Sequence, residues 1–140
     1  MSETQLGPID YLIIEFPSQT ISAAGFTSLL ERVQAGSIFV IDIEFVRREG
    51  STLQTVPAHD LGTVAGLDFA ELDGAATDLF DDDDRSFISA AISDGALAAV
   101  VVYEELSLVP VLAAFANDGA RIVAQGPVDI ADLDAALGDN

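Results

Sequence analysis

An alternating run at residues 38–48, IFVIDIEFVRR, is the feature that most constrains the fold. Its odd-numbered apolar residues fall on one side of an extended chain, and Asp42 and Glu44 fall on the other. A period of two in a run rich in β-branched and aromatic residues predicts a strand. The chain is therefore expected to build a sheet in which this strand presents an apolar side and an acidic side.

The rest of the chain predicts two strand–helix–strand units on either side of a polar middle segment. Apolar residues that recur at helical spacing, with capping residues before them and glycines after them, mark the helices. In chain order, the expected elements are a strand at Ile9–Phe16, a helix at 22–36, the strand at 38–48, a helix at 84–95, a strand at 96–103, a helix at 107–117, a strand at 121–125 and a terminal helix from Asp129.

These units predict an α+β fold of the ferredoxin-like, split βαβ type. Right-handed crossovers would give an antiparallel sheet with the helices on one face. Residues 49–95 would form an insert between the two βαβ units, with a hairpin strand at 53–56 and one or two helices. A doubly wound α/β sheet is the alternative, although it needs more continuous alternation of strand and helix than 49–95 offers. The length of 140 residues fits a single domain, 1–140.

The composition excludes several classes of function. The chain has 24 acidic residues against five Lys plus Arg, a formal net charge of −19, and no cysteine. Without cysteine there is no disulfide framework, thiol nucleophile or thiolate metal site. All five basic residues are arginines, so Schiff-base chemistry and a phosphate-loop lysine are also excluded. The charge opposes binding to nucleic acid and to anionic lipid.

A membrane location is not expected either. Residues 96–116 form the most apolar window of the chain and are long enough to span a bilayer. However, Glu104 and Glu105 lie at the middle of this window, where charged side chains are costly in a membrane. The first eight residues lack the basic start and apolar run of a signal peptide. The sequence therefore predicts a soluble, cytoplasmic protein.

Three stretches resemble a family of small acidic actinobacterial proteins catalogued only as a domain of unknown function. They are GPIDYLIIEFP at residues 7–17, VIDIEFVRR at 40–48 and VVYEE at 101–105. The resemblance extends loosely from about Gly7 to Leu137 and is weakest over 62–84. It implies an α+β fold in a bacterial, intracellular protein, and it implies no catalytic residue or substrate.

Three polar groups have both a structural and a functional interpretation. Four consecutive acids, Asp81, Asp82, Asp83 and Asp84, do not have calcium-loop spacing and are better placed to cap a helix. The only histidine, His59, could titrate near neutrality, but no second histidine or cysteine supports a transition-metal site. It is expected to be a surface or helix-start residue. The pair Arg47 and Arg48 could hold an anion, although the surrounding acids offer it partners enough.

Acids also interrupt the strands, at Glu15, Asp42, Glu44 and Glu104. A catalytic pair of carboxylates must converge in a dry cavity, where burial shifts their pKa values. In the expected sheet these acids lie apart, and only Asp10 with Glu104 or Glu105 could approach at one edge. We therefore expect no catalytic residue, no cofactor and no metal site.

A sheet with helices on one face leaves its other face open. A mixture of apolar side chains, acids and one arginine there is typical of an association surface. The expected interface residues are Tyr11, Ile13, Val40, Asp42, Glu44, Val46, Arg121 and Val123, with Glu15 and Gln125 on the same face.

The leading functional hypothesis is a non-enzymatic protein that acts through protein–protein contacts. Its first partner would be a second copy of itself, in a two-fold dimer or a larger assembly, and another protein is the next candidate. The alternative is a small-ligand-binding regulatory module of ferredoxin-like fold. A carboxylate- or metal-dependent enzyme is the third class.

Overall fold

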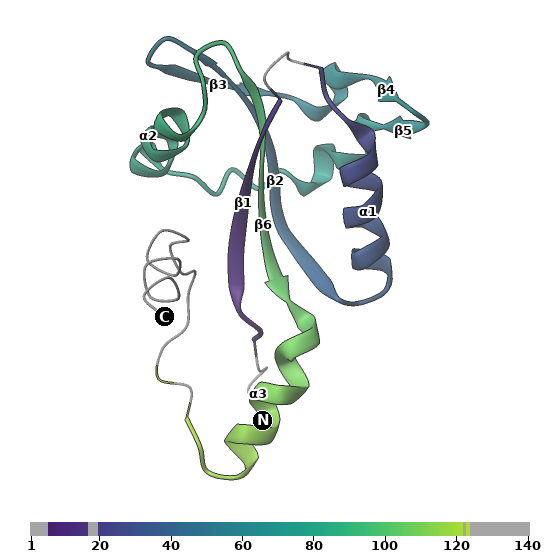
Figure 1. The fold of residues 1–140 in the computed structure, drawn as a ribbon, viewed down its shortest axis with the longest axis vertical. Coiled ribbons are helices and arrows are strands. Elements are labelled where there is room, and N and C mark those ends of the chain that lie inside the picture. Colours follow the sequence, from purple (N-terminus) through teal and green to yellow (C-terminus); the bar gives the residue numbers. More distant parts are fainter. Residues whose placement is uncertain (1–5, 17–19, 122, 124–140) are drawn as a thin grey trace, which may run out of the picture.

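The structure is a computed structural model that describes residues 6–16, 20–121 and 123. Figure 1 shows a sheet seen nearly edge-on, with α1 on one side of it and α2 on the other. The elements in chain order are β1 (Ile9–Phe16), α1 (Ala23–Gln34), β2 (Ile38–Glu49), β3 (Thr52–Val56), η1 (Ala58–Leu61), β4 (Thr63–Val64), β5 (Leu67–Asp68), η2 (Phe69–Ala75), α2 (Asp82–Ala91), β6 (Leu97–Glu105), η3 (Leu106–Leu108) and α3 (Val109–Asn117).

The main sheet is antiparallel throughout and has the strand order β1-β6-β2-β3. β6 carries the sequence LAAVVVYEE and is buried along most of its length, because β1 and β2 flank it on both sides. β4 and β5 form a separate two-stranded sheet. The prediction of a mixed α+β fold with an antiparallel sheet is confirmed.

The strand order differs from the predicted pair of units. β1 and β2 lie on either side of β6, so the first unit, β1-α1-β2, is split as expected. The second strand pair is β3 and β6, which lie on either side of β2, and α2 precedes β6. Of the predicted unit at 96–125, the strand and the following helix are present as β6 and α3, but neither Arg121 nor Val123 belongs to the predicted last strand. Gln125 and the predicted terminal helix lie outside the described residues.

Apolar side chains pack on both faces of the sheet. On the face that α1 covers, here called the α1 face, three aromatic rings meet at centroid distances of 5.4 to 5.9 Å: those of Phe26, Phe45 and Phe69. On the opposite face, here called the α2 face, Ile88 of α2 packs with Val46 and Val100. The described residues therefore form two hydrophobic cores, one on each side of the sheet.

This arrangement corrects the prediction of helices on one face only. α2 comes from the 49–95 segment and covers the face that the sequence left open (Figure 1). The ferredoxin-like arrangement is accordingly not confirmed. The reason is physical: the α2 face carries Val46 and Val100, and the apolar side of the amphipathic helix α2 removes these side chains from water.

The connection between the two cores passes around an open edge of β2. η2 belongs to the α1 face, where Phe69 and Leu72 are buried, and α2 belongs to the other face. Residues 76–81, here called the crossing segment, join them. β3 ends at Val56, opposite Phe45, so the preceding part of β2 has no β3 neighbour. The crossing segment meets β2 at that place, at Asp42 and Glu44.

A β-bulge divides β2 into two parts. The register shifts between Val40 and Asp42, where Val40 lies opposite Tyr103 and Asp42 opposite Val102. One extra residue reverses which side chains face which side of the sheet. Val40 therefore packs on the α1 face instead of sharing a face with Asp42, and the predicted alternation holds only beyond the bulge.

The helix ends follow their sequence signals. Ser22 is the N-cap residue of α1, and Gly36 follows its C-terminus with a φ of 78°, which a residue without a Cβ adopts readily. Pro110 lies in the first turn of α3, as predicted. No residue of α3 is buried. Among the described helices, none combines the length and the apolar character that a bilayer span needs.

The second core gives a direct test. Truncating Ile88, which is 3% exposed, to alanine removes buried methyl groups and should destabilise the fold by about 2–5 kcal/mol. Phe87→Ala, one residue earlier at 56% exposure, should cost about 1 kcal/mol or less. Denaturant unfolding measures both. Equal, small effects at the two positions would contradict the packing of α2 on the sheet.

Candidate functional site

The acids of β2 hold the crossing segment. The backbone N–H of Thr77 donates to Asp42 Oδ1 at 2.8 Å, and the N–H of Leu79 donates to Glu44 Oε2 at 3.3 Å. Asp42 is fully buried and Glu44 is 4% exposed. The two carboxylates thus accept hydrogen bonds from backbone N–H groups of the crossing segment, which lies outside regular secondary structure. Without these acceptors the N–H groups would lack partners.

Asp42 and Glu44 also act on each other. Burial, then the hydrogen bond with Asp42 and the negative charge of Asp42, raise the pKa of Glu44 to about 7. The Leu79 N–H lowers it and the charge of Asp78 raises it further, both to a smaller extent. The second oxygen of Asp42, Oδ2, is buried and receives no donor from the described residues.

The other strand acids hold backbone in the same way. Glu15 accepts the N–H of Ser93 at 2.6 Å, just after α2, and Ser93 Oγ lies 3.3 Å from the second carboxylate oxygen. Glu104 accepts the N–H of Gly7 at 2.7 Å. Gly7 lies so close to β6 that an added Cβ would collide with the Glu105 carbonyl oxygen. The four strand acids therefore each hold a different backbone N–H. Contrary to the expectation that these acids lie apart, Asp42 and Glu44 are buried side by side, whereas Glu15 and Glu104 contact other segments.

The sequence predicted that Asp10 could approach either Glu104 or Glu105, and the structure agrees for Glu105 only. Asp10 lies opposite Tyr103, whereas Glu104 lies opposite Ile9, so Asp10 and Glu104 point to different faces of the sheet. Asp10 and Glu105 both lie near Tyr103. Burial, followed by the charges of Asp10 and Glu105, raises the pKa of the Tyr103 hydroxyl.

The run of four acids caps α2, as the sequence predicts. Asp81 accepts the N–H of Asp84 at 2.8 Å, and the Asp84 carboxylate accepts the N–H of Asp81 at 3.1 Å. This reciprocal capping box satisfies two free N–H groups of the first turn. In the part of the chain that the structure describes, no group of three or more potential ligands is placed to hold a metal ion.

His59 lies in the short helix η1 and is exposed. Its Nδ1 is 3.0 Å from Asp73 Oδ2, and its Nε2 is 3.3 Å from Asp60. The backbone N–H of His59 donates to the other oxygen of Asp73. The residue links η1 to η2 at the surface, which agrees with the expected helix-start position.

Arg47 and Arg48 do not act as a pair. Arg48 donates to the carbonyl oxygens of Gly50 and Ile92 at 2.7 and 2.6 Å, and so holds the end of α2 against the β2–β3 hairpin. Arg47 lies on the opposite face of the sheet, because adjacent residues of a strand alternate. Its Nε is buried and lacks a hydrogen-bond partner among the described residues.

The predicted interface residues are only partly brought together. Tyr11 and Ile13 share the α2 face with Asp42, Glu44 and Val46, as predicted. That face is not open, however. Val46 is 1% exposed, and the two acids are covered by the crossing segment.

The remaining members of the predicted interface lie elsewhere. The bulge places Val40 on the opposite face of the sheet. Arg121 and Val123 follow α3, outside the main sheet. The predicted surface therefore does not exist as a continuous patch.

Sequence reasoning missed the exposed edge of the sheet. Among the described residues, β1 pairs with β6 alone. The backbone carbonyl of Pro8 accepts the N–H of Glu105, while the N–H of Tyr11 bonds to the Asp10 side chain instead of to β6. The alternation of an antiparallel ladder then directs the backbone groups of Ile9, Tyr11, Ile13 and Glu15 toward the free edge. A continuous apolar run in β1 was the available signal.

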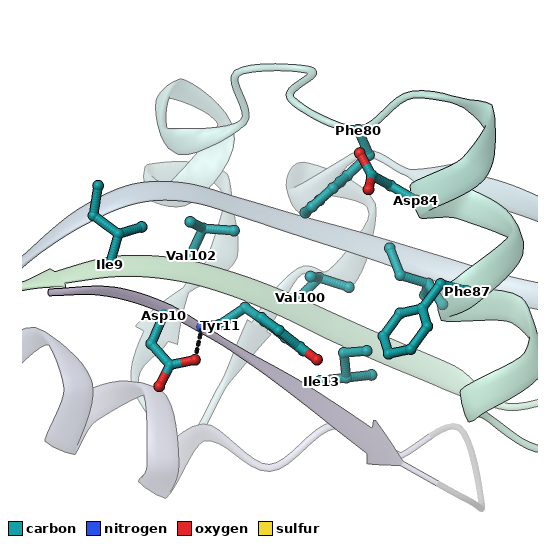
Figure 2. A pocket seen from close by; sticks show the side chains of 10 residues that line it. Ile9, Asp10, Tyr11, Ile13, Phe80, Asp84, Phe87, Val100 and Val102 are labelled. Carbon is teal, nitrogen blue, oxygen red and sulfur yellow. Dashed lines mark hydrogen bonds between the residues drawn. The ribbon is translucent and has the colours of Figure 1, made fainter. Parts of the chain in front are cut away.

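An apolar cavity lies on each side of β1. The first, here called the aromatic cavity, has a volume of about 320 Å³ and lies between β1, β6 and α2. Figure 2 shows its aromatic side chains, Tyr11, Phe80 and Phe87, facing the same space, with Ile13 and Val100 at its base. The second cavity, of about 400 Å³, lies between β1 and α1 and includes Leu12, Ile14 and Leu29.

The raised pKa of Glu44 predicts a pH dependence with a definite sign. The folded state keeps the Glu44 proton up to about pH 7, whereas the unfolded chain releases it near 4.5. Because the folded state binds more protons between these values, this group's contribution to the free energy of unfolding falls as pH rises from about 4.5 to 7. Glu44→Gln, which keeps a donor and an acceptor, should flatten that part of the curve.

The measurement is the difference in unfolding free energy between the wild type and Glu44→Gln across this pH range. Taking the difference cancels the general repulsion among the other acids. Glu31→Gln, on the exposed side of α1, is the matched control and should follow the wild-type curve. A difference that is constant with pH would contradict the raised pKa of Glu44.

Comparison with protein-family models, with curated proteins and with solved structures finds no match for this chain. The resemblance to the acidic actinobacterial family therefore stays a prediction.

Proposed function

We propose that this chain is a non-enzymatic, cytoplasmic protein that acts through protein–protein contacts, and that its first partner is a second copy of itself. The observation that carries the proposal is the outer edge of β1, which no other described strand pairs with and where the Tyr11 N–H bonds only to the adjacent Asp10 side chain. A long, apolar edge strand with unpaired backbone groups is a template for pairing with another strand, and proteins usually avoid or cover such an edge. The predicted association thus moves from the sheet face to the sheet edge.

The side chains of β1 support this location. Ile9, Tyr11 and Leu12 are 44–46% exposed, and Ile14 is 37% exposed, although all four are large and apolar. They lie on both faces of the strand, beside the two cavities. A strand that is apolar on both faces is typical of a position inside a sheet, with cover on either side.

β1 is also complementary to itself. Two copies related by a two-fold axis at Leu12 would pair antiparallel, with Tyr11 of each copy opposite Ile13 of the other. In that register Asp10 lies opposite Ile14 and Glu15 opposite Ile9, so no acid faces an acid directly across the junction. Like charges directly opposite each other would destabilise the pair. The product is a continuous eight-stranded sheet. The backbone hydrogen bonds between the two copies of β1 come from its odd-numbered residues.

The net charge of −19 sets the conditions for this association. Two copies repel each other at low ionic strength, and salt screens exposed charges over a Debye length of about 10 Å at 0.1 M. Association should therefore strengthen as sodium chloride is added. A contact made by ion pairs would weaken instead.

The edge proposal is tested with two lysine substitutions. In 0.5 M sodium chloride the wild type should have twice the monomer mass by light scattering, and Leu12→Lys should be a folded monomer. Phe39→Lys is the matched control, because Phe39 is 55% exposed on β2 and the substitution makes the same change in charge. It should remain a dimer.

Hydrogen exchange adds a second measurement. The Ile13 amide should exchange slowly in the dimer and rapidly in Leu12→Lys. A wild type that is monomeric at every salt concentration contradicts self-association, and slow exchange of Ile13 in such a monomer would assign the edge to another part of the chain. A folded, dimeric Leu12→Lys would move the interface away from β1.

A small-ligand-binding module is the second candidate. The observation that favours it is the aromatic cavity, which has a formed apolar wall and an accessible mouth. The cavity does not require self-association, so the two candidates are tested separately.

A further inference from the structure

We propose that the aromatic cavity binds a small organic cation, with an alkylated ammonium group held among aromatic rings. This is independent of self-association through β1. Three aromatic side chains from two separate parts of the chain line one cavity of about 320 Å³: Tyr11, Phe80 and Phe87 (Figure 2). The faces of aromatic rings carry negative charge density, and aromatic cages are a recurring way to recognise quaternary ammonium groups.

Two of the rings meet at nearly a right angle, as adjacent walls of such a cage do. The planes of Tyr11 and Phe87 are inclined at 87°, and their centroids are 6.2 Å apart. Phe87 is 56% exposed and Tyr11 is 44% exposed, so both rings lie at the mouth of the cavity and not in the core. Phe80 is partly buried and connects this cage to the second core.

The charge of the cavity selects a cation. Its charged lining residues are both acids, Asp10 and Asp84. Figure 2 shows Asp84 beside Phe80 and above the Tyr11–Phe87 pair, whereas Asp10 points away on the other side of β1. One oxygen of Asp84 accepts the Asp81 N–H, and its other oxygen is the one that can face a bound ammonium group. The remaining aromatic and aliphatic lining would receive an apolar body.

The N-terminus of α2 does not reverse this preference. A helix N-terminus carries an effective charge of roughly +0.5, which alone would favour an anion. Here the capping box occupies two of the N–H groups, and Asp81 is followed by the three acids of the first turn. Four carboxylates outweigh the helix dipole, so the field at the mouth of the cavity is negative.

Three probes of one size test the proposal: benzyltrimethylammonium, benzyl alcohol and benzylsulfonate. Methyl resonances of Ile13, Val100 and Val102, followed by NMR in 0.3 M sodium chloride, report on occupancy of the cavity. We expect saturable shifts with the cation, at least five-fold weaker binding of the alcohol, and no saturable shift with the sulfonate. The titration is run on the wild type and on Leu12→Lys, whose substituted residue lies on the other face of β1, so that loss of the dimer and loss of the cation site are distinguished.

Three variants distinguish binding by the residues that line the cavity from attraction by the general negative charge of the protein. Phe87→Ala and Asp84→Asn should each weaken binding of the cation by five-fold or more, and the asparagine keeps an oxygen for the capping hydrogen bond. Asp83→Asn is the matched control, because it removes the same charge next to Asp84 but from a residue that does not line the cavity. It should bind within two-fold of the wild type. Equal binding of the cation and the alcohol, absence of saturation, or equal effects of Asp83→Asn and Asp84→Asn would each overturn the proposal.

Discussion

The fold depends on one constraint: a single chain covers both faces of its sheet and must therefore pass from one face to the other. It does so where β3 is too short to pair with the whole of β2. The backbone at this passage lacks regular hydrogen-bond partners, and Asp42 and Glu44 supply them from beneath. Burying an acid is costly unless it is hydrogen-bonded. The N–H groups of the crossing segment provide hydrogen bonds to the two buried acids, and the acids provide acceptors to these N–H groups.

Much of the local structure could be read from the sequence. The three long strands were predictable because β-branched residues recur in short runs, and α2 because an acidic cap precedes it. The face that α2 covers was not predictable, since Phe69 and Ile88 are apolar residues of one segment and nothing local assigns them to opposite cores. The bulge at Val40 was also hidden, because a one-residue shift leaves the alternating pattern on each side of it intact.

The same distinction applies to the functional residues. The expectation that the strand acids form no catalytic site stays a prediction. Their partners in the structure are backbone groups of distant segments, which a sequence does not specify. The predicted association surface failed because it assumed an uncovered face. The exposed apolar surface lies instead at the edge of the sheet, where β1 separates two cavities. Edge position is a property of strand order, and strand order is set by contacts far apart in the chain.

The way the crossing segment is held has an evolutionary consequence. Its hydrogen bonds run from main-chain N–H groups, and the side chains of residues 76–79 point into solvent. Side-chain substitutions there keep the main-chain donors, except that Asp78 has a φ of 53° and its charge acts on Glu44, while positions 42 and 44 are restricted. Relatives of this chain could thus diversify the loop that ends in Phe80, and with it the molecule that is recognised, without rebuilding the scaffold.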